Sequence, residues 1–287
     1  MCTRCDHPFS AAPAPSVASA WNPRRAFLLA AAGAVLAKPA LAQVDVGKAS
    51  VARNIVPVEQ IESAGVQQYG QLLEQARAKG ALAGENNPQL QRLRAIAKRL
   101  IPFAMPWNSR ARDWKWEVNL IGSKQINAFC MPGGKIAFFT GILDQLKLTD
   151  DEVAMVMGHE MAHALREHAR ARMAKSAGTG AALSIGAQLL GWGQVGDLAA
   201  RAGTQLITLK FSRSDETEAD LVGLELAARA GYDPKASVSL WQKMATASKN
   251  QGGLSFLSTH PSGPDRISKL EANLPKVEKL YRDARKS

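Results

Sequence analysis

The chain of 287 residues lacks most features that mark a special class of protein. It has only three cysteines, and Cys130 is the single one beyond residue 42. Beyond that residue we find no stretch of 18 uninterrupted apolar residues, no repeat period, and no basic run with interleaved aromatics. These absences exclude a polytopic membrane protein and argue against a nucleic-acid partner. With 46% hydrophobic and 21% charged residues, the composition is that of a globular protein.

The first 42 residues have the pattern of an export signal. Arg24-Arg25 precedes an apolar run at residues 26–37, which is too short to cross a bilayer because a spanning helix needs roughly 20 residues. Ala40-Leu41-Ala42 follows as a small-x-small cleavage site. We therefore expect residues 1–42 to be a twin-arginine-type signal peptide, and residues 43–287 to form a single exported, periplasmic domain.

Removal of that segment would change the properties of the chain. It would leave 32 basic and 24 acidic residues, a net charge of +8, which favours salt-sensitive contact with an anionic membrane surface. Gln43 offers no acceptor for a lipoprotein anchor, and no transmembrane helix is expected in the mature chain. Because Cys130 would be the only cysteine left, stability must come from core burial rather than from an intramolecular disulfide.

The order of periodic segments predicts an α+β domain, mainly helical, with a small three-stranded sheet. Strand-like alternation occurs at residues 114–120, 126–130 and 135–139, and the first of these has the pattern of a half-buried strand. Pro132-Gly133-Gly134 predicts a hairpin turn between the other two. Helical periodicity occurs at residues 58–80, 88–101, 149–175, 212–230, 235–249 and 263–285. Residues 178–209 are apolar and interrupted by glycines, and we expect them to form a broken helical excursion, that is, an interrupted helical segment that covers the core.

The segment His159-Glu160-Met161-Ala162-His163 lies inside the helix expected to begin at Thr149. Four residues advance a helix by slightly more than one turn, so His159 and His163 leave the same face and can share one tetrahedral ion. Glu160 is rotated about 100° from His159 and can reach a water at the open position of that ion. The helix is apolar nearly all round, which indicates burial and argues against two solvated surface histidines.

Two histidines need a third ligand to hold zinc. A metzincin-type third histidine is excluded, because Arg166 and Ala169 occupy the positions of the required glycine and histidine. His168 is one position short, and we expect it to be an ordinary polar residue that points elsewhere on the helix. A downstream helix offers Glu216, with Asp220 four residues later on the same face to accept a hydrogen bond from a ligand histidine.

Glu216 is favoured over Glu218 as the third ligand, since Glu218 lies about 160° from the face of Glu216. For Asp215 and Glu218, a solvated acidic face is the simpler interpretation. One zinc ion per chain is therefore the expected cofactor.

These motifs resemble the ordered blocks of the zinc peptidase family that includes CAAX prenyl endopeptidases, HtpX-type proteases and BepA-like periplasmic proteases. The matching residues are Asn127-Ala128-Phe129, Pro132-Gly133-Gly134-Lys135, Gly158 to His163, Ser212-Arg213, Glu216 to Asp220, and His260-Pro261-Ser262 with Arg266. The resemblance covers about residues 50–275 and implies a thermolysin-like gluzincin core, with His159, His163 and Glu216 as ligands and Glu160 as catalytic base. The chain differs in lacking the transmembrane helices of the first two groups and the repeat domain of BepA.

Other positions have expected roles with open alternatives. Asn127 and Ala128, in a strand at the sheet edge, are expected to bind an extended substrate, although by themselves they fit an ordinary strand nearly as well. His260 is expected to approach the zinc, either to stabilise the oxyanion or to occupy the open position as a latch. A loop-capping histidine is the simpler alternative for His260. Arg266 is expected to hold that loop through a carboxylate that the sequence does not identify.

The leading hypothesis is a periplasmic zinc endopeptidase in which Glu160 takes a proton from a metal-activated water and passes it to the leaving amine. The compartment and the resemblance suggest unfolded or misassembled envelope proteins as substrates. The alternative is a chaperone-like binding module with a structural or latent zinc. A permanent fourth ligand, His260, would favour that alternative, whereas a base beside an open position argues against it.

Overall fold

The computed structural model describes residues 44–177, 206, 209–251, 254–261 and 263–286. The expected signal segment at 1–42 lies outside these ranges, and so does nearly all of the expected excursion at 178–209. Within the described ranges, every helix is too short or too polar to cross a membrane.

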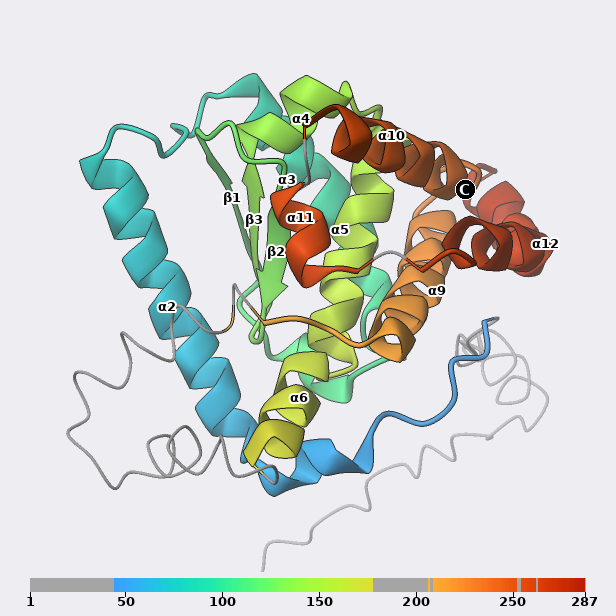
Figure 1. Ribbon diagram of the computed structural model, residues 1–287, viewed down its shortest axis with the longest axis horizontal. Helices are drawn as coiled ribbons and strands as arrows, with labels where there is room; N and C mark the ends of the chain where they lie inside the picture. The colour runs from blue at the N-terminus through green and yellow to red at the C-terminus, as the bar shows by residue number, and fades with distance from the viewer. Residues whose placement is uncertain (1–43, 178–205, 207–208, 252–253, 262, 287) are drawn as a thin grey trace, which may run out of the picture. The chain divides into compact units, whose positions relative to one another are not determined.

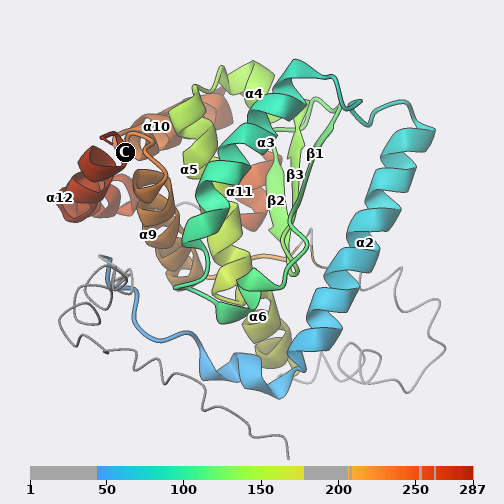
Figure 2. The same cartoon turned by 180° about the vertical axis from the view of Figure 1, so that it is seen from behind.

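A mixed sheet of three strands lies between helices α2 (Val58–Ala78) and α5 (Asp150–Leu165) in both views (Figures 1 and 2). Its order is β1-β3-β2, with β1 at Glu117–Ile121, β2 at Ala128–Met131 and β3 at Lys135–Phe139. The central strand β3 pairs parallel with β1 and antiparallel with β2. The fold class is therefore confirmed, and β2 lies at an edge of the sheet.

The expected hairpin connects β2 to β3. Gly133 and Gly134 both have positive φ angles, +84° and +77°, a backbone region that residues with a side chain rarely adopt. Gly134 also packs under Trp116, because a Cβ atom added there would lie 2.8 Å from the indole ring. The two glycines therefore allow the tight connection that places β2 beside the site.

The expectation of a half-buried strand at 114–120 is wrong in two respects. Regular pairing begins only at Glu117, and Asn119, on the face predicted to be polar, is 7% exposed. Helix α2 covers that face: the side-chain amide of Asn119 donates to the hydroxyl of Tyr69 at 3.2 Å, and this hydroxyl donates to the carbonyl of Ile136. A polar residue in the alternation therefore marks a hydrogen-bonded contact with α2 rather than exposure to solvent.

The expected helix from 149 to 175 is interrupted. Helix α5 ends at Leu165, and α6 begins at His168, because Glu167 adopts a left-handed conformation with φ of +57°. The N-terminus of α5 is as predicted: Thr149 accepts a hydrogen bond from the backbone N–H of Glu152, and the Glu152 carboxylate accepts one from Thr149. The break therefore follows immediately after the second histidine of the motif.

The other helices expected from periodicity are confirmed, whereas the pattern does not predict the short helices α4 and α11. One or two turns carry too little periodicity to be recognised. These elements are α3 (Pro88–Leu100), α4 (Thr140–Leu146), α6 (His168–Ala177), α9 (Arg213–Arg229), α10 (Ala236–Gln251), α11 (Ser255–Thr259) and α12 (Arg266–Ala284), with 3-10 turns η1 (Val51–Ile55), η2 (Ile101–Phe103) and η3 (Ser109–Arg112).

Candidate metal centre

Helix α5 carries the motif through the middle of the core. Every residue from Glu152 to Leu165 is buried, and His159 and His163 are each only 3% exposed. A helix that is apolar all round must be covered on all sides, and here α9, α3, α10 and the sheet supply that cover. Its polar residues therefore have to find partners inside the protein.

Helices α5 and α9 cross with their backbones in contact. A Cβ atom added to Gly223 would lie 2.6 Å from the backbone nitrogen of His159, and one added to Gly158 would lie 2.8 Å from the carbonyl oxygen of Gly223. Only glycine fits at either position, because real Cβ atoms do not approach so closely. This crossing brings the acidic first turns of α9 against His159 and His163.

Ser212 caps the N-terminus of α9. Ser212 accepts a hydrogen bond from the backbone of Asp215, whose carboxylate in turn accepts from the backbone of Ser212. Asp215 is thus a buried capping residue, and the expected solvated acidic face is wrong for it. The cap sets the rotation of α9 and points Glu216 at the histidines.

The potential ligand atoms of His159, His163 and Glu216 converge. The two Nε2 atoms are 3.1 Å apart, and the Glu216 carboxylate oxygens lie 3.5 Å from His159 Nε2 and 3.4 Å from His163 Nε2. In a tetrahedral site with metal–nitrogen bonds of about 2.05 Å, ligand atoms lie about 3.3 Å from one another. The donor set and its spacing therefore fit one zinc ion.

The environment favours the protonation states that a metal requires. Burial holds the pKa of His163 well below its usual value, so this imidazole is neutral. Burial alone would raise the pKa of Glu216, but hydrogen bonds from His163 and His260 hold it well below the usual range. Neutral imidazole and ionised carboxylate are the forms that bind a metal.

A second layer of side chains orients His159. The Nδ1 atom of His159 lies 2.9 Å from Asp220 Oδ1, so a proton on Nδ1 leaves Nε2 free to face the cluster. Arg266 supports Asp220 with two hydrogen bonds, of 2.6 and 2.9 Å, and bonds Glu216 at 2.8 Å. These are the carboxylate partners that the sequence left unidentified. Burial would raise the pKa of Asp220, but Arg266 more than offsets it and the pKa is lowered.

His168 and Glu218 belong to the surroundings of His163, contrary to expectation. Because the helix breaks at Glu167, His168 turns back, and its Nδ1 lies 3.0 Å from His163 Nδ1. Glu218 accepts a hydrogen bond from Arg166 at 2.9 Å and lies 3.4 Å from His168 Nε2. No sequence signal reveals this arrangement, since it depends on one left-handed residue.

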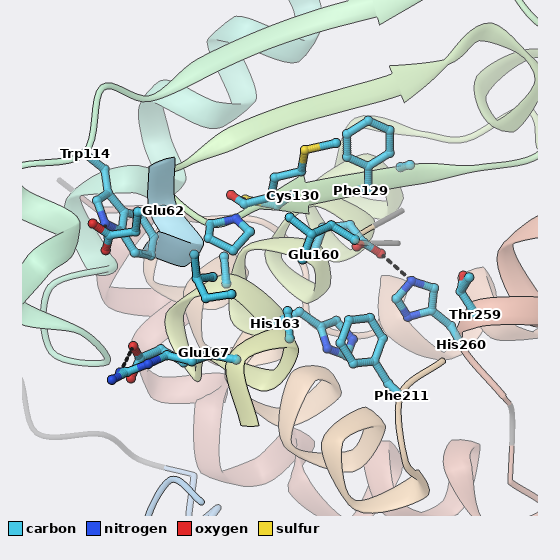
Figure 3. A pocket seen from close by; sticks show the side chains of 18 of the residues that line it. Glu62, Trp114, Phe129, Cys130, Glu160, His163, Glu167, Phe211, Thr259 and His260 are labelled. Carbon is cyan, nitrogen blue, oxygen red and sulfur yellow. Dashed lines mark hydrogen bonds and ion pairs between the residues drawn. The ribbon is translucent and has the colours of Figure 1, made fainter. Parts of the chain in front are cut away.

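Glu160 and His260 lie next to each other in the pocket that His163 also lines (Figure 3). His260 Nδ1 is 3.0 Å from Glu216 and 3.3 Å from His159 Nε2, and its ring stacks on Phe256 at 4.4 Å. His260 Nε2 lies 3.6 Å from Glu160 Oε1, which has no hydrogen-bond partner among the described residues. Burial raises the pKa of Glu160. His260 has a raised pKa, because Glu160 and Glu216 outweigh the lowering by burial.

Asn127 and Ala128 line the same pocket as Glu160, His163 and His260. The carbonyl of Asn127 accepts from the backbone of Phe139 in β3, so strand alternation turns the backbone groups of Ala128 and Cys130 away from β3. The Ala128 N–H is covered by the side-chain oxygen of Asn127, at 3.0 Å. The structure thus brings together all the residues expected at the site and adds Cys130 and His168.

Comparisons with known proteins agree with this geometry. A family model described as peptidase family M48 matches residues 87–274. The chain is 37% identical over 185 residues to the mitochondrial metalloendopeptidase OMA1 of Schizosaccharomyces pombe, covering 64% of this chain and 52% of that protein. It is 29% identical over 206 residues to the metalloprotease LoiP of Escherichia coli, covering 70% of this chain and 76% of LoiP.

A third relative is the beta-barrel assembly-enhancing protease of Yersinia pestis, 32% identical over 163 residues, which are 52% of this chain and 32% of that protein. The chain spans only a third to a half of the length of the OMA1 relatives that it matches. The cluster of His159, His163 and Glu216 fits the ligand set of a zinc metalloendopeptidase, two histidines of one helix and a glutamate of another.

Proposed function

The chain belongs to peptidase family M48, and from this membership we propose that it is a zinc-dependent endopeptidase with His159, His163 and Glu216 as ligands. The observation that carries the proposal is the convergence of two ring nitrogens and a carboxylate at tetrahedral spacing, with a Glu160 oxygen beside them that has no hydrogen-bond partner among the described residues. When bound, zinc supplies polarisation of the scissile carbonyl and lowers the pKa of a water to about 7.

Glu160 is the general base in this proposal. Its buried carboxylate has a raised pKa, which brings its proton affinity closer to that needed near neutral pH. It takes a proton from the attacking water, holds it on an oxygen that has no hydrogen-bond partner among the described residues, and gives it to the leaving amine. Asp220 and Arg266 act through the ligands, by keeping His159 and Glu216 in place.

The substrate binds as an extended strand along the outer edge of β2. The backbone groups of Ala128 and Cys130 face that edge and can pair with a peptide, which gives affinity from main-chain hydrogen bonds. Asn127 has to release the Ala128 N–H when a peptide pairs there, so Asn127 acts as a local substitute for substrate.

Unfolded or misassembled envelope proteins are the substrates we propose. One relative is named a beta-barrel assembly-enhancing protease, and residues 1–42 carry the pattern of a twin-arginine signal ahead of the domain at 43–287. A reporter fused to residues 1–42 should be exported only when the twin-arginine pathway is intact. The net charge of +8 that remains after removal of this segment supports transient contact with an anionic membrane surface.

Metal analysis combined with casein cleavage tests the proposed activity. The purified protein should contain one zinc and cleave casein, whereas Glu160→Gln should keep the zinc and lose activity by at least about 1000-fold. Glu74→Gln, an exposed residue on α2, is the matched control and should change neither quantity. Equal casein cleavage by the wild type and Glu160→Gln would refute the endopeptidase proposal.

A latent or structural zinc is the second candidate, and the position of His260 favours it. Four potential ligand atoms, including one of His260, lie within 4.8 Å of one another. His260→Ala should raise casein cleavage if His260 occupies the open position as a latch. The same substitution should lower cleavage if His260 stabilises the oxyanion, and an unchanged rate would exclude both roles.

A further inference from the structure

His163 has a buried partner on the side of its ring that faces away from the other ligands. Its Nε2 atom faces His159 and Glu216, whereas its Nδ1 atom lies 3.0 Å from Nδ1 of His168. A neutral imidazole that binds a metal through Nε2 carries its proton on Nδ1, so His163 has to donate a hydrogen bond there. Both His163 and His168 are only 3% exposed, so water has little access to this contact. His168 is therefore the acceptor for the ring proton of His163.

Glu218 and Arg166 keep His168 in the form that can accept. If Nδ1 of His168 accepts a hydrogen bond, its own proton has to lie on Nε2. That Nε2 atom is 3.4 Å from the Glu218 carboxylate, which accepts from Arg166 at 2.9 and 2.8 Å. The sequence of donors and acceptors is thus consistent from Arg166 through Glu218 and His168 to His163.

The break between α5 and α6 brings His168 to this position. On an uninterrupted helix, His168 would be rotated by about 140° from His163 and would point away from it. Instead α5 ends at Leu165, whose carbonyl accepts from the side-chain amide of Asn108 at 3.1 Å, and Glu167 has a φ of +57°. A residue with a side chain rarely adopts this left-handed conformation, so its surroundings have to stabilise it.

The N-terminal segment 47–56 provides contacts on both sides of the break. It includes η1, which packs against α6, and Figure 1 shows it as the blue ribbon beneath that helix. Its contacts are the Arg53–Glu167 ion pair at 2.9 Å, the hydrogen bond from Arg166 to the Gly47 carbonyl at 2.9 Å, and the hydrogen bond from Arg170 to the Val56 carbonyl at 2.5 Å. The segment lies outside residues 87–274, which match the family model, so this support comes from the chain's own N-terminal region.

We propose that His168 is a positioning residue for the metal ligand His163, and that the segment 47–56 holds it in place by stabilising the break at Glu167. This inference rests on the proposed function, in which His163 binds zinc. Phe211 stacks on the His163 ring at 3.9 Å but offers no acceptor for its Nδ1 proton. Removal of the His168 acceptor would leave a buried N–H without a partner, and Nε2 would be less firmly directed at the metal.

The zinc affinity of the full chain, measured by competition with a fluorescent chelator, tests the role of His168. His168→Phe keeps an aromatic ring beside His163 and Phe211 but removes the acceptor, so zinc affinity should fall by about 10–100-fold. His168→Asn is smaller but keeps an accepting oxygen near the position of Nδ1, and it should recover most of the loss. A purely structural role predicts the opposite order, because Phe preserves more of the packing. Lys175→Ala, at an exposed position of the same helix, is the control and should leave the affinity unchanged.

Proton NMR of the zinc-loaded protein gives a second measurement that packing alone would not change. The Nδ1 proton of His163 should exchange slowly with water in the wild type and in His168→Asn, because it is buried in a hydrogen bond. In His168→Phe this resonance should be lost or exchange rapidly. If His168→Phe does not fold, His168→Leu, which also lacks an acceptor, takes its place in both measurements.

A pair of substitutions at Glu167 tests the role of the segment. Glu167→Ala and Glu167→Gly both lose the ion pairs with Arg53 and Arg170, but only glycine adopts a positive φ without cost. Zinc affinity should therefore be several-fold higher in Glu167→Gly than in Glu167→Ala. Arg53→Ala should weaken zinc binding several-fold, whereas the control Arg77→Ala, which removes an exposed ion pair of α2, should not.

The outcomes distinguish this inference from the proposed function. Equal zinc affinity in the wild type and His168→Phe, or higher affinity in His168→Phe than in His168→Asn, overturns the positioning role and leaves the peptidase proposal intact. Equal affinity in the wild type, Arg53→Ala and both Glu167 variants overturns the role of the segment 47–56. A wild-type protein that binds no zinc overturns the proposed function itself.

Discussion

The two sides of the pocket at the candidate metal centre are built in different ways. On the metal side, α5 and α9 touch through the backbones of Gly158 and Gly223, and buried carboxylates and an arginine hold the histidines. On the other side, α2 packs on the sheet at Gly65, where a Cβ atom would lie 2.6 Å from the carbonyl oxygen of Pro132. Farther along α2, Gly70 is exposed and has nothing within 4 Å.

The difference reflects what each side has to do. A metal site needs its ligand atoms within a fraction of an ångström of fixed positions, and close backbone contact between two helices provides that precision. Helix α2 carries none of the residues His159, His163 and Glu216, so its contact with the sheet does not need the same precision.

Gly223→Ala should have the largest effect, because it forces α9 away from α5 at the level of His159. We expect a loss of about 3 kcal/mol or more in the free energy of unfolding, together with loss of zinc and activity. Thermal denaturation and metal analysis measure both. Gly70→Ala is the matched control, and its expected effect is a gain of roughly 0.5–1 kcal/mol, as for any exposed helical glycine. Retention of full zinc content by Gly223→Ala would contradict the inference that close contact between α5 and α9 positions the metal ligands.

Asp220→Asn should weaken the metal side without altering its packing volume. A carboxylate accepts hydrogen bonds on both of its oxygens, from His159 Nδ1 and from Arg266, whereas the asparagine amide has only one accepting oxygen. His159 is therefore less firmly oriented in the variant. Zinc affinity should fall by about 10–100-fold. Competition with a fluorescent chelator measures the affinity, and an unchanged dissociation constant would show that Asp220 does not support the ligand.

Gly65→Ala tests the other side of the pocket. The added methyl group meets the Pro132 carbonyl and should displace α2, at a cost of about 1–3 kcal/mol. Zinc content should remain at one per chain, because no ligand lies on α2. Loss of zinc together with stability in this variant would show that the two sides are not independent.

Glu152→Gln should have the smallest effect and a defined pH dependence. Burial would raise the pKa of Glu152, but Lys243 and the Thr149 backbone outweigh it and lower the pKa. A lowered folded-state pKa gives stability that is present above the unfolded pKa of about 4.3 and lost as the pH falls through the folded value. At neutral pH the variant should lose about 1 kcal/mol of capping stability.

Thermal denaturation at several pH values checks this expectation. The difference between wild type and Glu152→Gln should shrink as the pH falls from about 4.3 toward the lower folded-state pKa, because the carboxylate is protonated first in the unfolded state and then in the folded state. A difference that stays constant down to pH 3 would assign the effect to packing rather than to the charge.

Patterns within short stretches of the sequence predicted much of the secondary structure and part of the candidate site. The long helices, the hairpin glycines and the Thr149 cap follow from periodicity and from short-range hydrogen bonds, and so does the common face of His159 and His163. Glu216 could also be preferred over Glu218 from helical rotation alone. Each of these inferences depends on residues fewer than about two helical turns apart.

The failures depend on residues far apart in the chain. Asn119 is buried because α2 covers it, fifty positions away from its partner Tyr69. His168 reaches His163 because Glu167 takes a left-handed conformation, and the Glu167 carboxylate pairs with Arg53, which is distant in the chain, at 2.9 Å.

By itself, then, the sequence determined which side chains could meet a metal from a single helix, since a helix has one geometry whatever surrounds it. Only the tertiary structure decided that α5 and α9 meet at two glycines, which partner Arg266 takes, and how far the pocket extends toward α2. Those features depend on the balance of packing and polar pairing over the whole fold, and no short window of sequence contains that balance.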